Sequence, residues 1–151
     1  SPYDQYIKNN NTNAMTDAQI RGMNLFFSDR TNCSTCHSGF NFTNYAFENN
    51  GLYIQYADIG RMRLTLKEED MALFKVPGLR NIEMTGPYMH DGSIQTLQQV
   101  IDHYQSGGMD HPHKNPILKP LDLTTPEQKD LIEFLKALTD DTFLTNPIFK
   151  Y

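Results

Sequence analysis

The pentapeptide Cys33-Ser34-Thr35-Cys36-His37 contains both cysteines of this 151-residue chain and places a histidine directly after the second one. This order is the attachment pattern of a c-type haem. Two thiols can add to the haem vinyl groups as thioethers, and the next imidazole can bind the iron. We therefore predict one covalent haem c, anchored by Cys33 and Cys36, with His37 as the proximal iron ligand.

Two other kinds of site share part of this pattern. A thioredoxin-like redox pair also uses Cys-x-x-Cys, at the junction of a strand and a helix, but it does not require the histidine. A zinc site would need further ligands, and only histidines remain to supply them: His90, His103, His111 and His113. A haem uses all three residues of the motif, so we favour it.

Length and charge narrow the class of protein. A chain of 151 residues fits one domain with its own hydrophobic core. The formal net charge is −5, and the scattered lysines and arginines offer no basic patch, so we expect no nucleic acid partner. An acidic surface instead suits a basic or dipolar redox partner. No apolar run is long enough to cross a bilayer, so we expect no membrane span.

The haem motif also predicts where the protein works. Haem is normally attached to thiols outside the cytoplasm, after export. The chain begins at Ser1-Pro2 without an initiator methionine or a signal segment, so we expect that a signal peptide has been removed. The predicted location is the periplasm.

Three segments carry the capping residues and apolar spacing of helices. The first begins at Thr16-Asp17-Ala18-Gln19, and the second runs from Thr96-Leu97 to Gly107-Gly108. The third opens with Thr125-Pro126-Glu127-Gln128, with proline at the first helical position, and should pack across the first helix. We expect long ordered loops between them and a short helix within residues 67–74.

The two ends of the chain lack these signals. Residues 1–13 include three consecutive asparagines and are predicted to form a strap or linker, and residues 139–151 an irregular tail. The fold prediction is therefore a single mainly α, cytochrome c-like haem domain over residues 1–151, with long ordered loops.

Tyr104 is a candidate for the second axial position of the iron. Leu97, Val100, Ile101 and Tyr104 follow one another at helical spacing, which places the phenol on the apolar face of the second helix. A phenol oxygen on that face needs a partner, which could be a backbone carbonyl or the iron. Met89 is the main rival, because a thioether commonly pairs with histidine in cytochromes c.

The loop before this helix carries a second candidate, Arg80. Its guanidinium group could pair with a haem propionate, because the two groups match in geometry. An ordinary surface ion pair would explain the residue equally well.

These segments together resemble the C-terminal haem domain of the bacterial di-haem cytochrome c peroxidase family, which includes MauG. The matching segments are Ser1-Pro2-Tyr3-Asp4, the haem motif, Phe74 to Pro77, Leu79-Arg80-Asn81, Thr85 to Ser93, Thr96-Leu97 and Gly107-Gly108. The block Pro-Tyr-x-His-Asp-Gly at residues 87–92 is specific to that family.

The resemblance implies an oxidoreductase. In that family an N-terminal haem cleaves peroxide, and a C-terminal haem passes electrons to it; this chain would be the second. Its implied partners are the N-terminal haem domain of the same protein, hydrogen peroxide, and a small redox donor such as a cytochrome c or a cupredoxin; a homodimer is compatible with them. No catalytic residue is assigned, since the fragment alone would lack the peroxide site. A stand-alone mono-haem electron-transfer protein is the alternative.

The resemblance also implies ligands. Tyr104 matches the distal ligand of the relay haem, which is methionine in the peroxidases and tyrosine in MauG-like members. An anionic oxygen ligand there would favour ferric and higher oxidation states. Thr85 and Pro87 match positions whose backbone oxygens help to bind Ca²⁺ between the two domains.

Overall fold

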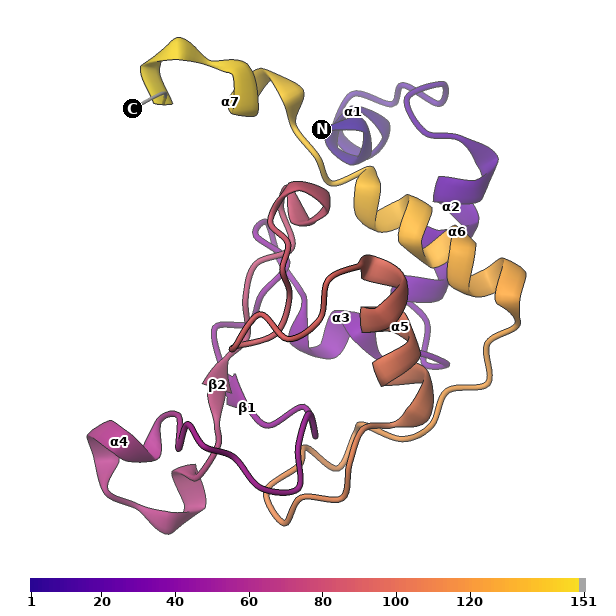
Figure 1. Ribbon diagram of the computed structural model, residues 1–151. Helices are drawn as coiled ribbons and strands as arrows, with labels where there is room; N and C mark the ends of the chain where they lie inside the picture. The colour runs from indigo at the N-terminus through magenta and orange to yellow at the C-terminus, as the bar shows by residue number, and fades with distance from the viewer. Residues whose placement is uncertain (150–151) are drawn as a thin grey trace.

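Three helices form the framework of the chain in a computed structural model, which describes residues 1–149 (Figure 1). They are α2 (Asp17–Phe26), α5 (Leu97–Ser106) and α6 (Thr125–Lys136). All three were expected from the sequence, and the mainly α fold class is confirmed.

Each of these helices begins with a capping box. The cap residues and their partners are Thr16 with Gln19, Thr96 with Gln99, and Thr124 with Glu127. The expected cap of α6 was one residue too late. The Glu127 carboxylate accepts from the Thr124 backbone N–H at 2.8 Å, so the helix begins with Thr125.

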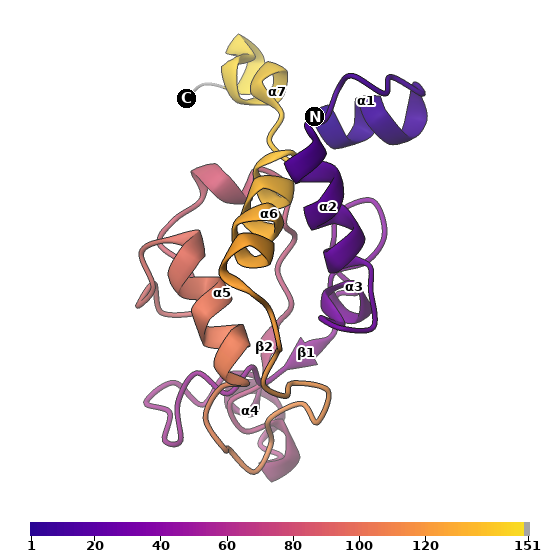
Figure 2. The same cartoon turned by 90° about the vertical axis from the view of Figure 1, so that its right-hand side faces the viewer.

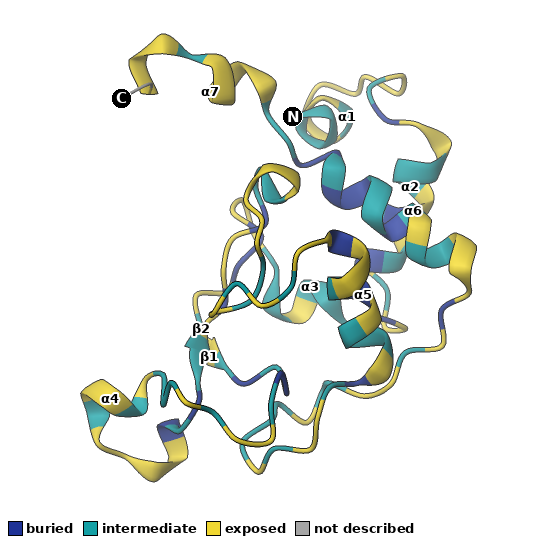
Figure 3. Cartoon of the chain, viewed as in Figure 1, coloured by how far each residue is buried: buried dark blue, intermediate teal, exposed yellow. Residues whose placement is uncertain are grey.

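Helix α6 packs against α2, as the sequence predicted (Figure 2). Gly22 of α2 makes the close approach possible, because a Cβ at this position would overlap the backbone carbonyl of Asp130 in α6. Phe26, Leu131 and Phe134 are buried between the helices. Figure 3 shows buried stretches on α6, where Leu131, Phe134 and Leu135 are buried.

The remaining elements are short. They are α1 (Pro2–Lys8), α3 (Cys33–Cys36), α4 (Met62–Thr65), α7 (Asp141–Thr145), strands β1 (Phe47–Glu48) and β2 (Phe74–Lys75), and 3₁₀ turns at Glu68–Asp70, Ile82–Met84 and Pro147–Phe149. The strands pair antiparallel, with Phe47 opposite Lys75. Long ordered loops connect these elements, as expected.

The helix expected within residues 67–74 is only a 3₁₀ turn at Glu68–Asp70. Ala72 has a φ of 56°, in the left-handed region, and Phe74 enters strand β2. Neither conformation can continue a helix.

Both ends of the chain contain helices that the sequence analysis missed. Residues 2–8 form α1, because Ser1 and Asp4 make a capping box and Pro2 occupies the first turn. At the other end, Asp140 caps α7. The prediction of a strap over 1–13 and an irregular tail from 139 was therefore wrong for these segments; residues 150–151 lie outside the described part.

Within residues 1–149, no helix combines the length and apolar character needed to cross a membrane.

Candidate haem-binding site

The haem motif forms a single helical turn, α3. The His37 backbone N–H donates to the Cys33 carbonyl at 2.9 Å and closes the turn. Residues three apart on a helix lie on the same face, so the turn directs the Cys33 and Cys36 side chains to one side. Both thiols are free. Burial raises the pKa of each, and the Glu48 carboxylate adds to the effect at Cys36.

The His37 ring is fixed by a backbone carbonyl. Its Nδ1 lies 3.0 Å from the Phe42 oxygen. Because a carbonyl can only accept, Nδ1 must carry the proton, and Nε2 keeps a free lone pair. Burial lowers the pKa of His37, which favours the neutral imidazole. This is the state in which histidine binds a metal, with its other nitrogen held by a hydrogen bond.

The carbonyl that orients His37 belongs to a core residue. The Phe42 side chain is 2% exposed. Its ring packs edge to face with Tyr3, Phe26 and Phe134 at centroid distances of 5.2, 5.9 and 6.2 Å. The core between α2 and α6 therefore helps to set the orientation of the imidazole.

Tyr104 lies on the face of α5 that the spacing predicted. Leu97 and Ile101 on that face are buried, and Tyr104 is half-buried. Burial raises the pKa of the phenol, and the nearby Cys33 and Cys36 thiols act in the same direction. A hydrogen bond from the Asn50 side chain acts the other way and lowers the pKa. Burial favours the neutral form, so an anionic Tyr104 would need a positive charge beside it.

Met89, the predicted rival ligand, contacts the side chain of Asn50. Its sulfur accepts a hydrogen bond from the Asn50 side-chain amide at 3.2 Å. His103 is engaged elsewhere: its Nε2 lies 3.0 Å from the Asn50 carbonyl and must donate to it. Sequence reasoning missed Asn50, because Asn-Asn-Gly at 49–51 signals only a turn.

Arg80 forms an ion pair instead of standing free for a propionate. Its two terminal nitrogens donate to Asp4 at 2.7 and 3.0 Å, and Nε donates to the Phe40 carbonyl at 2.9 Å. The guanidinium group also lies over the rings of Phe40 and Phe42. Arg80 therefore forms an ion pair, the second of the two roles considered for it. The pair is half-buried and joins α1 to the loop before α5.

Thr85 and Pro87, the residues implied for calcium, are both exposed. Within the described residues, their carbonyl oxygens accept no hydrogen bond, so they are free for water or an ion. Residues 1–149 hold no group of three or more histidine, cysteine, aspartate or glutamate side chains suited to a metal. The zinc alternative therefore gains no support.

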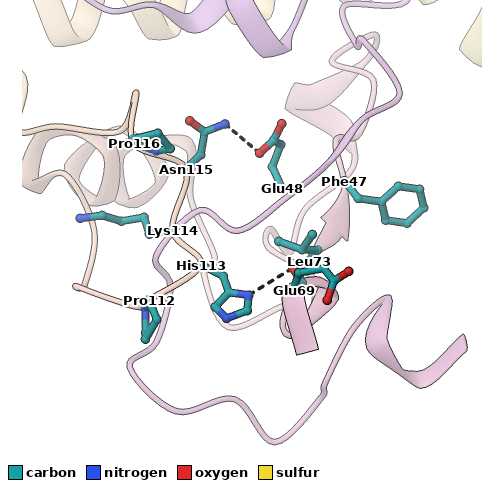
Figure 4. Close-up of a pocket in the computed structure, with 9 residues that line it drawn as sticks. All are labelled: Phe47, Glu48, Glu69, Leu73, Pro112, His113, Lys114, Asn115 and Pro116. Atoms are coloured by element: carbon teal, nitrogen blue, oxygen red, sulfur yellow. Dashed lines mark hydrogen bonds between the residues drawn. The ribbon is translucent and has the colours of Figure 1, made fainter. Parts of the chain in front are cut away.

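A surface hollow of about 420 Å³ is lined by strand β1, the turn at residues 68–70 and the loop that follows α5 (Figure 4). Asn115 donates to Glu48 at 2.7 Å, and His113 Nδ1 lies 3.1 Å from the Glu69 carbonyl. These contacts tie strand β1 and the turn at 68–70 to the loop that follows α5.

Comparison with known proteins gives a consistent set of relatives, although no family model matches the chain. MauG of Methylorubrum extorquens is 35% identical over 140 residues, covering 91% of this chain and 39% of that protein. The cytochrome c peroxidase Ccp of Escherichia coli is 40% identical over 108 residues, covering 67% of this chain and 23% of that protein. The chain spans less than half the length of these curated relatives.

The solved structures agree with this result. A MauG-like protein associated with microbial copper homeostasis superposes with a TM-score of 0.89 at 34% identity, covering 99% of this chain and 55% of that one. The diheme peroxidase BthA from Burkholderia thailandensis has a TM-score of 0.77 at 22% identity, covering 95% of this chain and 47% of that one, and so supports the fold alone.

We predict that the denatured protein carries one covalently bound haem. The Cys33 and Cys36 thiols are the only two in the chain, and α3 places them on one face. Mass spectrometry should show the mass of the chain plus one haem, and Cys33→Ala with Cys36→Ala should show the chain alone. An apo mass for the natural sequence, or haem extracted by acid and organic solvent, would contradict the prediction.

We also predict that the Asp4–Arg80 pair stabilises the fold in a pH-dependent way. Partial burial alone would raise the pKa of Asp4, but hydrogen bonds from Arg80 and Ser1 outweigh it and lower the pKa from 3.8 to about 2. Because the folded pKa is the lower one, the stabilisation is complete above the unfolded pKa and is lost as the pH falls toward 2.

Denaturant unfolding of the natural protein and Asp4→Asn at several pH values measures this effect. The difference should be about 1 kcal/mol at pH 7, since the pair is partly solvated, and should vanish near pH 2. Asp29→Asn, an exposed acid without an ion pair among the described residues, is the control and should show no such trend. A difference that does not change between pH 7 and 2 would exclude the ion pair as its cause.

Proposed function

Because the chain belongs to the family of MauG and the cytochrome c peroxidases, we propose that it is a haem c domain of a di-haem peroxidase-like oxidoreductase. In this proposal the domain relays electrons to a peroxide-reducing haem on an N-terminal domain of the same protein. Hydrogen peroxide is then the substrate of the whole protein, and a small redox protein is the electron donor.

The observation that supports this proposal most directly is the state of His37. The Phe42 carbonyl holds its Nδ1, so Nε2 keeps a lone pair, and the two free thiols stand on the helical turn that ends at His37. A zinc or disulfide role for the cysteines would not require this tautomer. A haem c requires all three groups together.

The residues of the chain have distinct parts in this function. A bound haem would supply one-electron oxidation and reduction. Cys33 and Cys36 would hold it covalently, and His37 would bind the iron through Nε2. Tyr104 would supply the distal oxygen, and its anionic form would favour the ferric state.

Further features fit the same proposal. The acidic chain suits a basic face on the electron donor. The exposed carbonyl groups of Thr85 and Pro87 would contribute to a Ca²⁺ site completed by the N-terminal domain. Attachment of haem to cysteines normally follows export, so the proposed location of the protein is the periplasm.

We predict that the isolated 151-residue chain, loaded with haem, has negligible peroxidase turnover. His37 and Tyr104 would both bind the iron of the relay haem, so peroxide would find no open site. Peroxide-dependent oxidation of a reduced cytochrome c measures turnover, and reduction by dithionite serves as the control that the haem is redox-active. Robust turnover would show that this haem is itself the peroxide site, and the relay role would then be wrong.

Sequencing and assaying a longer form of the protein that includes the upstream region would distinguish the proposal from the mono-haem alternative. A second Cys-x-x-Cys-His in that domain and recovery of turnover in the longer protein are expected. A chain with one haem motif and no turnover would instead be a stand-alone electron carrier.

We predict that Tyr104→Phe removes the distal ligand while it keeps the packing of α5. The ferric spectrum should lose its phenolate-to-iron charge-transfer band, and the reduction potential should rise, because an anionic ligand stabilises the ferric state. Tyr6→Phe in α1 is the matched control, since it deletes the same oxygen far from the haem motif in sequence and should change neither value. An unchanged spectrum in Tyr104→Phe would mean that another residue holds this position.

A further inference from the structure

Two side chains that can bind iron lie beside the same asparagine. The Asn50 amide nitrogen donates to the Met89 sulfur at 3.2 Å. The Asn50 backbone carbonyl faces Nε2 of His103, the residue before Tyr104 on α5, at 3.0 Å. The Asn50 side chain also lowers the pKa of the Tyr104 phenol. Asn50 therefore lies between the loop that carries Met89 and the helix that carries Tyr104.

Asn50 is held in this position by several bonds. Its side-chain oxygen accepts from the Leu52 backbone N–H at 3.2 Å, and its backbone carbonyl faces His103 Nε2 at 3.0 Å. Gly108, just after α5, lies so close that a Cβ there would come within 2.8 Å of the same carbonyl. The amide group therefore has little freedom to turn away from the sulfur.

Met89 is held from its own side as well. Its φ is 72°, in the left-handed region that a side chain as large as methionine rarely adopts. The residue before it, Tyr88, exchanges backbone hydrogen bonds with Ile94 at 2.7 and 3.4 Å. The loop thus presents the sulfur to Asn50 in a defined conformation.

We propose that Asn50 is a positioning residue that selects the distal ligand, because its amide group binds the Met89 thioether and keeps it from competing with Tyr104 for the iron. This inference rests on the proposed haem function. It assigns a role to a residue that the haem motif does not include, and it explains how a chain with both ligands can use only the phenol.

The test uses the haem-loaded protein and variants of Asn50. Asn50→Asp keeps the acceptor for the Leu52 N–H but removes the donor to sulfur, and Asn50→Leu removes both. In either variant, the ratio of thioether-ligated to phenolate-ligated protein should rise about five-fold. Loss of a hydrogen bond of about 1 kcal/mol changes an equilibrium constant by that factor. Ferric absorption, magnetic circular dichroism and the reduction potential report it, and the potential should shift upward.

A second substitution identifies the competing ligand. Met89→Leu alone should leave the spectrum and potential unchanged, and added to Asn50→Asp it should restore both. Asn44→Asp is the matched control, because Asn44 accepts from the Ala46 N–H at 2.9 Å as Asn50 does from Leu52, yet its amide does not bind a sulfur.

The outcomes separate this inference from the proposed function. If Tyr104→Phe changes the spectrum but both Asn50 variants match the natural protein, Asn50 has no selecting role. If the Asn50 variants change the spectrum and Met89→Leu does not reverse the change, Met89 is not the competitor. A changed ferric spectrum in Met89→Leu alone would mean that Met89 binds the iron in the natural protein. An unchanged spectrum in Tyr104→Phe would instead refute the ligand assignment in the proposed function.

Discussion

The hydrogen bond between His37 Nδ1 and the Phe42 carbonyl is the constraint on which the rest of the site depends. It fixes both the tautomer and the orientation of the imidazole. Phe42 has a φ of 53°, a backbone conformation that costs roughly 1–2 kcal/mol for a residue with a side chain. Burial of its ring against Phe26 and Phe134 offsets that cost. The packing that joins α2 to α6 therefore also orients the imidazole of the proposed iron ligand.

The proposed distal side of the haem site is built in a different way. Tyr104 stands on a regular helix, but Asn50 and Met89 belong to two separate loops. The contact between Asn50 and Met89 is one hydrogen bond, with a net contribution of about 1 kcal/mol, although Asn50 is itself held by further bonds. In the proposed site, a change at this one bond can therefore alter which group faces the haem, whereas a change in the orientation of His37 would require disruption of the core.

Local signals explain what could be predicted from the sequence. The capping boxes of α2, α5 and α6 and their apolar spacing lie within a few residues, and so the three helices and the face that carries Tyr104 were predictable. Ser1 and Asp4 form a capping box of the same kind, but the polar residues that follow it suggested a linker instead of a helix. Arg80 could not be assigned, because its partner Asp4 lies 76 residues away in the chain. Asn50 was missed for the same reason, since its partners come together only in the folded chain.

This division between the two sides bears on how the distal ligand can vary without loss of the fold. Tyr104, Met89 and Asn50 are absent from the buried core cluster of the described residues, whereas Phe42 belongs to it. A substitution at position 104 between tyrosine and methionine would therefore remove few core contacts. In the proposed haem site, the substitution would replace a phenolate oxygen with a neutral sulfur, and so change which oxidation state the iron prefers. In the proposed function, the energy of folding and the tuning of the haem are therefore carried by different residues, and each can change while the other is kept.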